Sequence, residues 1–540
     1  MSSVTNISGF YELPKAISNV SPDELRVIEK LLAVWAAKLK RNQIRSMYFD
    51  GKNPLKPTGN IPEEALSRVR AVLGWPAKAV TGLSQRIIFD GFVTTTDDQD
   101  PFDLQGLLDD NRFDLEFPQA TDSSLKHSCS FITTAKGDVQ SGEPDVLIMA
   151  RSAEFSGGLW DKRRRRVEGY VAVKDLDGEG RVSSFDAFLP DVVISCEKQP
   201  SGKWKADRRK NTLGEVLVEA LPFDPQLDRP FGRSRISRAV MNITDRALMT
   251  IGRTEIGSDF FAVPRMLALG VAEDAFSKGK WQASIDRWFA LTRDEEGELP
   301  DVSQLPQLTM QPLLEQYRMY ASQFAGETGL PISSLGIVQD NPTSAEAMYA
   351  AEKDLVVQAR ATTRVFGGAL RQVARKAVMI RDGLNEAPPE LRGIRANWVN
   401  PAFTSPVTAA DALVKLSGVF PWLGESEVAL EYAGFTQAEI TRLLADKRRS
   451  SMGSLIGRLT AAQDQGEAPQ PASQPASQPA GDLSPEDTKR AADALGILIR
   501  AGVDPMDAAQ RVGLDGMKFT GAVPVALRMP EKDAERLEEN

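Results

Sequence analysis

Residues 327–352 read ETGLPISSLGIVQDNPTSAEAMYAAE and join a loop to the longest helix that the sequence predicts. Gly and Pro punctuate 327–342, which predicts a loop. Thr343–Glu346 then has the capping-box spacing with which helices begin. An apolar stripe continues to about Arg381, so this helix would be about 60 Å long at 1.5 Å per residue. Gly367–Gly368 lies inside it and predicts a kink.

Two shorter amphipathic helices precede that loop. Apolar residues recur at helical spacing in 234–259 and in 312–326. The helices bracket an insert, 260–311, in which we expect three features: a strand at Arg265–Leu269, a helix around Trp281–Phe289 and an acidic turn at Arg293–Pro300. The pattern is that of a stalk that carries a small head.

The N-terminal part, 1–232, predicts a mixed α/β platform. Ser21 and Glu24 have the spacing of a capping box at the start of its first helix. Short β-rich runs follow, and Asp177-Gly178 and Ser201-Gly202 predict hairpin turns between some of them. The expected strands include Arg86–Val93, Val146–Met149, Val167–Val173 and Gly214–Leu221.

The C-terminal part changes in composition twice. A turn or strand around Trp398 is followed by shorter helices to about residue 463, one of which begins with the capping box Thr436–Glu439. Residues 464–483 are rich in Gln, Pro, Ala and Ser, which predicts a disordered linker. The tail, 484–540, regains helical patterning. From residue 464 onward there are 14 acidic and 8 basic residues, a net charge of −6.

Composition excludes several classes of protein. The 540 residues include 65 Lys and Arg and 74 Asp and Glu, a net charge of −9, which excludes a globally basic nucleic-acid binder. Two cysteines, Cys129 and Cys196, indicate free thiols in a reducing compartment. No apolar run reaches the length of a membrane-spanning helix, and the first residues, MSSVTNISGF, do not resemble a secretory signal.

The sequence contains no recognisable catalytic or metal-binding motif. No stretch has the spacing of a phosphate-binding loop, which argues against an NTPase. The acidic pairs Asp97-Asp98 and Asp109-Asp110 and the run Asp294–Glu296 could bind Mg²⁺, but solvated surface is the simpler interpretation. The single histidine, His127, has no recognisable partner and is most simply a surface or packed residue. We therefore predict no catalytic residue, no metal site and no cofactor.

The strongest local charge signal is a run of five cations before the predicted strand Val167–Val173. These residues are Lys162, Arg163, Arg164, Arg165 and Arg166. The run could attract a phosphate backbone or an acidic partner protein, or it could be an exposed loop. The sequence leaves these interpretations equally open. Lys205–Lys210 repeats the theme more weakly.

Four stretches, in this order, resemble one known family. They are PFGRSRISRAV (230–240), TGLPISSLGI (328–337), NPTSAEAMYAAE (341–352) and the closing pattern LGILIRAGVDPMDAAQRVGL through FTGAVPVALR (495–528). Together with the layout of stalk, insert, loop and long helix, they resemble the portal proteins of tailed double-stranded DNA bacteriophages with long non-contractile tails. The resemblance implies a helix-rich α+β fold.

The resemblance also implies a ring of twelve identical subunits at one capsid vertex, through which DNA enters and leaves. In this family layout, each part of the chain has a name: wing 1–232 and 343–402, stem 233–259 and 312–326, clip 260–311, tunnel loop 327–342 and crown 403–463. The implied partners are further copies of the chain, double-stranded DNA, the large terminase subunit, a head–tail adaptor, the major capsid protein and the scaffold. The protein would assemble in the bacterial cytoplasm, initiate capsid assembly and reside in the virion.

Candidate sites follow from that layout. A pore through which DNA slides should avoid strong cationic contacts, which would act as brakes. We expect four neutral tunnel-loop side chains to approach DNA: Ser333, Ser334, Gln339 and Asn341. The candidate partner contacts of the clip are Trp281, Trp288, Asp294, Glu295 and Glu296, although the simpler and favoured interpretation of the two tryptophans is that they form the clip core. The basic run of the wing could face capsid protein, scaffold or internal DNA.

Two other functions remain as alternatives. An enzyme, such as a nuclease or packaging ATPase, is disfavoured by the single histidine and the missing phosphate loop. A head–tail adaptor or tail ring without a packaging role is the second alternative.

Overall fold

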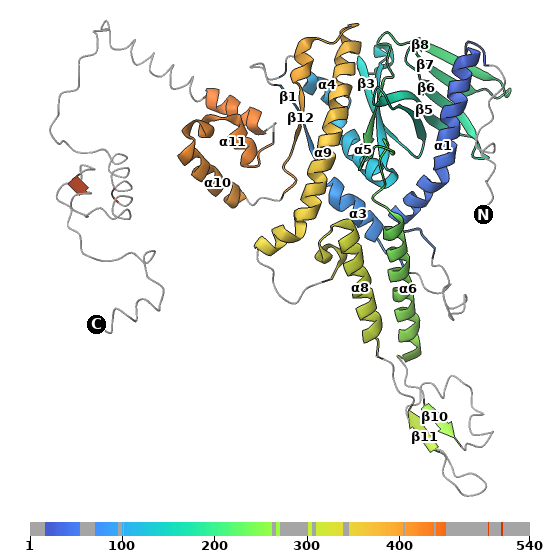
Figure 1. Ribbon diagram of the computed structural model, residues 1–540, viewed down its shortest axis with the longest axis vertical. Coiled ribbons are helices and arrows are strands. Elements are labelled where there is room, and N and C mark those ends of the chain that lie inside the picture. Colours follow the sequence, from blue (N-terminus) through green and yellow to red (C-terminus); the bar gives the residue numbers. More distant parts are fainter. Residues whose placement is uncertain are drawn as a thin grey trace. The chain divides into compact units, whose positions relative to one another are not determined.

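The structure is a computed structural model in which the chain forms two compact units, Met1–Ser450 and Ser451–Asn540. The residues that the structure describes are 17–54, 71–94, 100, 102–261, 266–269, 301–304, 309–337, 345–402, 406–436, 439–449, 495 and 509–510. Figure 1 shows helices and strands mixed in the first unit, which confirms the expected α+β class. The predicted linker and nearly all of the tail lie outside the described residues.

Helix α1 (Pro22–Phe49) begins with the predicted capping box. The Ser21 side chain accepts a hydrogen bond from the Glu24 amide, and the Glu24 side chain accepts one from the Ser21 amide. The buried stripe of α1 includes Trp35 and packs against an antiparallel sheet with the strand order β4-β5-β6-β7-β8. The strands of this sheet are β4 (Ser156–Asp161), β5 (Arg166–Leu176), β6 (Val182–Phe188), β7 (Val192–Lys198) and β8 (Trp204–Lys210).

Turn chemistry positions the hairpins of this sheet as predicted. The Asp177 amide donates to the Arg181 carbonyl in the turn between β5 and β6, and the Gln199 amide donates to the Lys203 carbonyl between β7 and β8. Each turn contains the expected Asp-Gly or Ser-Gly pair. Local sequence therefore determines where these strands reverse.

A second, three-stranded sheet has the order β3-β2-β9. Its strands are β2 (Cys129–Lys136), β3 (Val146–Ser152) and β9 (Val218–Pro222), with the 3-10 turn η2 (Val139–Ser141) between the first two. Strand β9 pairs with β2, and Cys129 lies opposite Pro222. About 90 residues of the chain separate the two strands. The predicted strands at 146–149 and 214–221 correspond to β3 and β9, the latter starting four residues later than expected.

Three helices lie where the sequence predicts mainly strands and turns. They are α3 (Trp75–Ser84), α4 (Leu104–Asp110) and α5 (Phe113–His127). Pro118 lies inside α5, whose first turn carries Asp114 and Glu116. The buried face of α5 packs against β2 and β3. The sequence did not predict this helix, because the segment is short and a proline is unfavourable inside a helix. Burial of α5 against the sheet offsets the free energy that the proline costs.

The two stalk helices are present and lie side by side (Figure 1). Helix α6 runs from Arg238 to Phe261 and helix α8 from Gln311 to Thr328. Their contacts show that they are antiparallel. Ser237 Oγ donates to Glu327 Oε1 at one end (3.1 Å), and Thr250 Oγ1 donates to Gln316 Oε1 further along (3.3 Å). The insert between them is described only at a two-stranded sheet, β10 (Met266–Leu269) paired with β11 (Asp301–Gln304).

The long predicted helix is α9 (Ala345–Arg381). It continues without interruption through Gly367 and Gly368, and the kink stays a prediction. A Cβ on Gly367 would lie 3.4 Å from Trp398 Nε1, so the glycine lets the indole approach the helix. Trp398 ends β12 (Arg395–Trp398), which pairs with β1 (Phe89–Val93). The turn η4 (Pro389–Gly393) links α9 to β12.

Two short helices follow β12. They are α10 (Pro406–Val419) and α11 (Glu427–Tyr432), separated by the turn η5 (Pro421–Glu425), and residues 439–449 are helical as well. The predicted capping box after α11 is confirmed. The Thr436 amide donates to Glu439 Oε2 (2.9 Å), and the Glu439 amide donates to Thr436 Oγ1 (3.4 Å). The corresponding box before α9, at Thr343–Glu346, lies at its start outside the described residues.

Candidate functional site

The stalk helices join the rest of the first unit at a buried arginine. Arg235 is only 7% exposed and lies just before α6. Its guanidinium donates hydrogen bonds to the Ala79 carbonyl of α3, the Gln358 side chain of α9 and the Thr328 carbonyl at the end of α8. Burial lowers the pKa of Arg235 to about 10. One cation thus connects α3, α8 and α9 to the start of α6. None of these hydrogen-bond partners is a carboxylate.

The residues around Arg235 form a shaped turn. Ser234 Oγ donates to the Lys126 carbonyl (2.6 Å), and the Arg235 amide donates to the Leu125 carbonyl (2.8 Å). Gly232 has a φ of +72°, and a Cβ there would lie 2.0 Å from the Phe223 carbonyl oxygen. Glycine is therefore required at this position. These contacts give the stretch 230–240 a physical role that the sequence did not reveal.

The candidate tunnel loop starts at the other end of this junction. Gly329 ends α8 in the left-handed conformation, and the short 3-10 helix η3 (Ile332–Leu335) follows. Ser333 and Ser334 are exposed on η3, whereas Leu335 is buried and anchors it. Exposure of the two serines is compatible with the expected role. The other two candidates, Gln339 and Asn341, lie outside the described residues.

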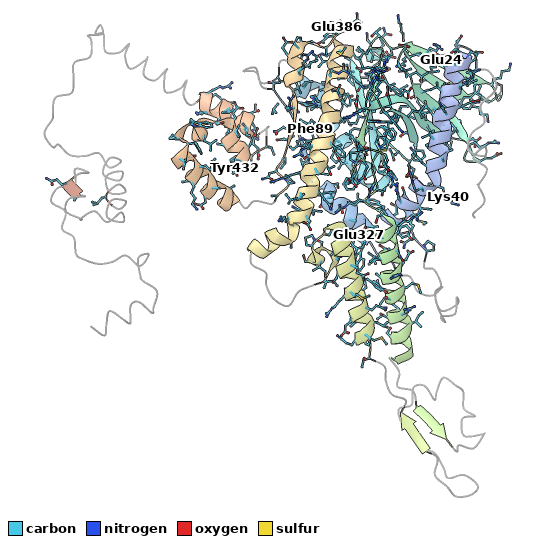
Figure 2. The ribbon with its side chains drawn as sticks, viewed as in Figure 1. Glu24, Lys40, Phe89, Glu327, Glu386 and Tyr432 are labelled. Atoms are coloured by element: carbon cyan, nitrogen blue, oxygen red, sulfur yellow. The ribbon has the colours of Figure 1, made fainter. Side chains whose placement is uncertain are left out.

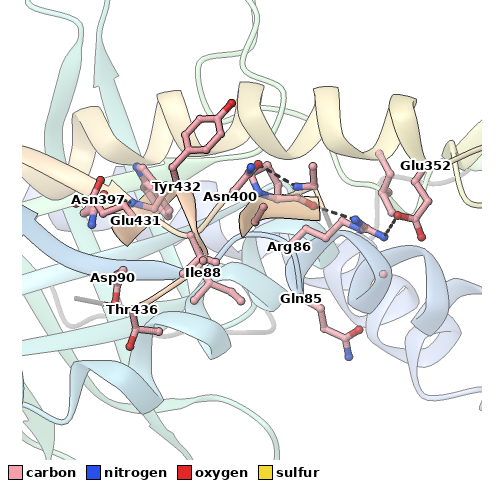
Figure 3. Close-up of a pocket in the computed structure, with 18 of the residues that line it drawn as sticks. Gln85, Arg86, Ile88, Asp90, Glu352, Asn397, Asn400, Glu431, Tyr432 and Thr436 are labelled. Carbon is pink, nitrogen blue, oxygen red and sulfur yellow. Dashed lines mark hydrogen bonds and ion pairs between the residues drawn. The ribbon is translucent and has the colours of Figure 1, made fainter. Parts of the chain in front are cut away.

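Ser334 also lines a cavity of about 580 Å³, drawn in Figure 3. The cavity lies between the end of α3, the start of α9, the end of β12 and α11. Arg86 crosses it, with Nη2 at 2.9 Å from Glu352 Oε2 and Nη1 donating to the Pro401 carbonyl (2.9 Å). Glu431 lies in the same cavity, and burial, with Asp90 nearby, raises its pKa. The ion pair Arg86–Glu352 thus holds the first turns of α9 beside α3.

The basic run forms the turn between β4 and β5. Asp161 Oδ1 accepts hydrogen bonds from the Arg163 and Arg164 amides, and these bonds lower the Asp161 pKa. Residues 162–165 are exposed. Arg166 differs from them, because its Nη1 lies 2.8 Å from Glu215 Oε2 and it belongs to β5. The structure thus separates four exposed cations, of which Arg164 lies 3.8 Å from Asp161, from Arg166, which is half-buried and pairs with Glu215.

The five candidate contacts of the clip fall on a part of the chain that the structure does not describe. These residues are Trp281, Trp288, Asp294, Glu295 and Glu296. The predicted helix around Trp281–Phe289 and the acidic turn lie there as well. Of the insert, the expected strand at 265–269 is present as β10.

His127 is packed, and it has a partner that the sequence did not reveal. The ring lies 2% exposed at the end of α5, with Nε2 3.3 Å from Glu154 Oε2 and 3.0 Å from Ser46 Oγ. Burial lowers the His127 pKa, whereas the hydrogen bond from His127 lowers the Glu154 pKa. Ser46 donates to the same Glu154 oxygen (2.6 Å), so the hydroxyl is committed to the carboxylate. The cluster joins α1, α5 and the β3–β4 turn.

Both cysteines are free and buried, and burial raises the pKa of Cys129 to about 11. Asp109 accepts a hydrogen bond from Gln105, and Asp97-Asp98 lies outside the described residues. Within the described ranges, no three metal-type side chains form a group, and no helix has the length and apolarity to cross a membrane.

Sequence reasoning missed the junction around Arg235 altogether. The signal available was weak: a cation directly before the apolar Ile236 at a predicted helix start, in the stretch GRSRIS. Its acceptors, the carbonyls of Ala79 and Thr328, are 156 and 93 residues away. Only the tertiary structure brings them together.

The chain is similar to proteins of one known family. Residues 28–451 match the family described as "Phage portal protein, SPP1 Gp6-like". The chain is 26% identical over 456 residues to the portal protein of Mycobacterium phage L5, covering 82% of this chain and 92% of that protein. It is also 26% identical over 429 residues to the portal protein of Mycobacterium phage D29, covering 77% and 87% of the two chains. Because the family match extends over most of the sequence, this chain belongs to the phage portal protein family.

Proposed function

We propose that twelve copies of this phage portal protein close into a ring at one capsid vertex and form the conduit for DNA packaging and ejection. The match to the portal protein family supports a structural role in the virion capsid rather than an enzymatic one. The observation that carries the proposal is the antiparallel pair α6 and α8. It is fastened to the wing at one end through Arg235 and carries the insert at the other.

Exposed apolar side chains support self-association. Val414, Trp422 and Tyr432 are 72%, 68% and 61% exposed on the segment from α10 to α11, and Figure 2 labels Tyr432 there. Several large apolar side chains exposed on one short segment are typical of an interaction surface. A closed ring supplies a partner for every such surface, since each copy meets two neighbours. We assign this segment, within 403–463, to the crown.

We assign the other parts by the same layout. The wing comprises 1–232 and 343–402, and the stem comprises 233–259 and 312–326. The clip, 260–311, would dock the large terminase subunit during packaging and a head–tail adaptor afterwards. The wing would contact the major capsid protein and scaffold and so help to initiate capsid assembly.

The tunnel loop, 327–342, would narrow the channel. Ser333 and Ser334 are exposed there, and the loop between Gly329 and Asn341 contains no Lys or Arg. Neutral side chains let a duplex pass because they release no counterions and form no strong phosphate contacts. Gln339 and Asn341 would complete the DNA-facing set.

Electron microscopy of the purified full-length protein tests the ring. We expect a flanged, stalked annulus with twelvefold symmetry in top views. A small flat ring would favour the alternative, a head–tail adaptor or tail ring without a packaging role. A chain that stays monomeric under all conditions would contradict both.

Complementation of a phage that lacks the gene tests the loop. We expect Gln339→Ala or a deletion within 333–341 to reduce packaged DNA or its retention, while particles still incorporate the protein. Ser322→Ala is a matched control, because Ser322 is exposed on α8 and lies outside the loop. Full packaging and retention by both loop variants would refute the assignment of the tunnel loop.

A further inference from the structure

Four arginines form a stripe along α9. Their spacings of four, seven and four residues bring Arg360, Arg364, Arg371 and Arg375 within about 60° of one another around the helix axis. The first and last are about 22 Å apart at 1.5 Å per residue. From Leu355 to Arg381 the helix contains no acidic residue. The positive charge of this face is therefore not balanced by the helix itself.

Among the described residues, neighbouring elements also leave the positive charge of most of the stripe without a carboxylate partner. Arg360 and Arg364 are exposed and Arg371 is half-buried. In the part of the chain that the structure describes, these three side chains make no ion pair and no side-chain hydrogen bond. Arg375 differs, since it pairs with Glu215 from the segment before β9. Three guanidinium groups are thus available to an external anion.

The stripe leads into a basic cavity of about 670 Å³. Arg166, Arg371, Arg375 and Arg392 line this cavity, opposed by two carboxylates, those of Glu215 and Glu386. Arg166 and Arg375 share Glu215. Arg392 is exposed and has no ion pair among the described residues. The cavity therefore carries net positive charge.

The basic run of the wing extends this surface further. Arg166 lines the cavity and is the last residue of the run, so the exposed cations 162–165 are continuous with it along the chain. Positive charge reaches from Arg360 on α9 to the turn between β4 and β5. Exposed cations thus adjoin the basic cavity along the chain, although the net charge of the whole sequence is −9.

The chemistry of this surface fits a phosphate polymer. Charges spread over about 22 Å exceed what one small anion can contact, whereas duplex DNA presents a negative charge about every 1.7 Å of its axis. Guanidinium groups match phosphate geometry better than ammonium groups do. We infer that the arginine stripe of α9 and the adjoining cavity bind the phosphate backbone of duplex DNA. The inference rests on the proposed function and adds a surface that holds DNA, distinct from the neutral loop past which DNA slides.

The test is DNA binding by the full-length protein in the assembled form in which it purifies. Fluorescence anisotropy with a duplex of about 30 base pairs is measured over a series of NaCl concentrations. We expect the triple variant Arg360→Gln, Arg364→Gln and Arg371→Gln to bind at least about tenfold more weakly at low salt. The slope of log affinity against log salt should shrink by about 2–3, since each phosphate contact contributes about 0.9.

A matched control removes three cations from another surface. Lys30, Lys40 and Arg41 are exposed on α1, where Figure 2 labels Lys40. Their replacement by Gln changes the net charge equally and should leave affinity and slope unchanged. The double variant Arg360→Gln with Arg364→Gln touches only exposed residues, and it provides the test if the triple variant misfolds.

Two results would overturn the inference. One is an unchanged affinity and salt slope in the arginine variants. The other is loss of assembly in sedimentation with DNA binding retained, which would place the stripe against the next copy of the chain. By contrast, a wild-type chain that binds DNA through the stripe but never forms a ring would contradict the proposed function and leave this surface established.

Discussion

At the scale of single residues, Arg235 is the contact on which the stalk depends. Replacement by Ala removes the donor for two buried backbone carbonyls, those of Ala79 and Thr328. We expect a loss of stability of about 1–3 kcal/mol, the cost of buried polar groups left unsatisfied. Arg235→Lys should restore only part of it, because one ammonium group cannot reach three acceptors arranged for a guanidinium. The melting temperature in thermal unfolding measures both effects.

Arg233 provides the control for Arg235. It lies two residues earlier and is half-exposed, and its side chain contacts Gln226, which is partly exposed, and Asp224, which is exposed. Arg233→Ala should change stability by less than about 0.5 kcal/mol, as surface substitutions usually do. Equal destabilisation by both substitutions would show that the buried contacts of Arg235 contribute no more to the free energy of unfolding than a surface contact does.

His127 predicts a pH dependence of stability. Its pKa is lowered by burial, with Lys126 and Arg45 nearby opposing the charged ring and Glu154 favouring it. The unfolded chain therefore takes up a proton at higher pH than the folded one, and stability falls as pH drops below about 6.5. Glu154, whose pKa is lowered, adds a further loss as pH falls below its ordinary value of 4.5.

A substitution isolates this effect because His127 is the only histidine of the chain. We expect the melting temperature of the wild type to fall between pH 7.5 and 5.5, a window in which few other groups titrate. His127→Gln should flatten that dependence. Parallel pH profiles of the two proteins would show that the His127–Glu154 pair does not control stability in this range.

At the scale of elements, the contact between α1 and β4 depends on a glycine. A Cβ on Gly157 would lie 3.1 Å from the backbone nitrogen of Trp35. Gly157→Ala should destabilise the protein by about 1–3 kcal/mol, since it overpacks a buried helix–strand contact. Gly178→Ala is the control, because a Cβ there meets no atom within 4 Å. Thermal unfolding compares the two, and equal melting temperatures would contradict the close approach.

At the scale of the whole molecule, the chain divides at residue 450. The first unit, Met1–Ser450, has nearly the same C-terminal boundary as the family match, which ends at residue 451. We expect a chain ending at Gln463 to fold and assemble as the full protein does, with a melting temperature within about 2 °C. Loss of folding or assembly would show that the segment from 464 onward, with its net charge of −6, contributes to the core structure.

Much of this architecture was determined by the sequence alone, because its signals are local. Capping boxes at Ser21 and Thr436, turn pairs at Asp177 and Ser201, and apolar stripes in α6, α8 and α9 each depend on residues a few positions apart. The order of stalk, loop and long helix follows from them. Of the four loop residues predicted to face DNA, the exposure of Ser333 and Ser334 is known, and the roles of all four stay predictions.

Only the tertiary structure decided which distant groups meet. The acceptors of Arg235, the pairing of His127 with Glu154 and the pairing of β2 with β9 join segments far apart in the chain, so no local pattern encodes them. The sequence likewise did not predict helix α5, because this helix is stabilised by packing on the sheet rather than by the helix propensity of its own residues. Burial selects these partners, since a charged or polar group removed from water needs a partner wherever the fold supplies one.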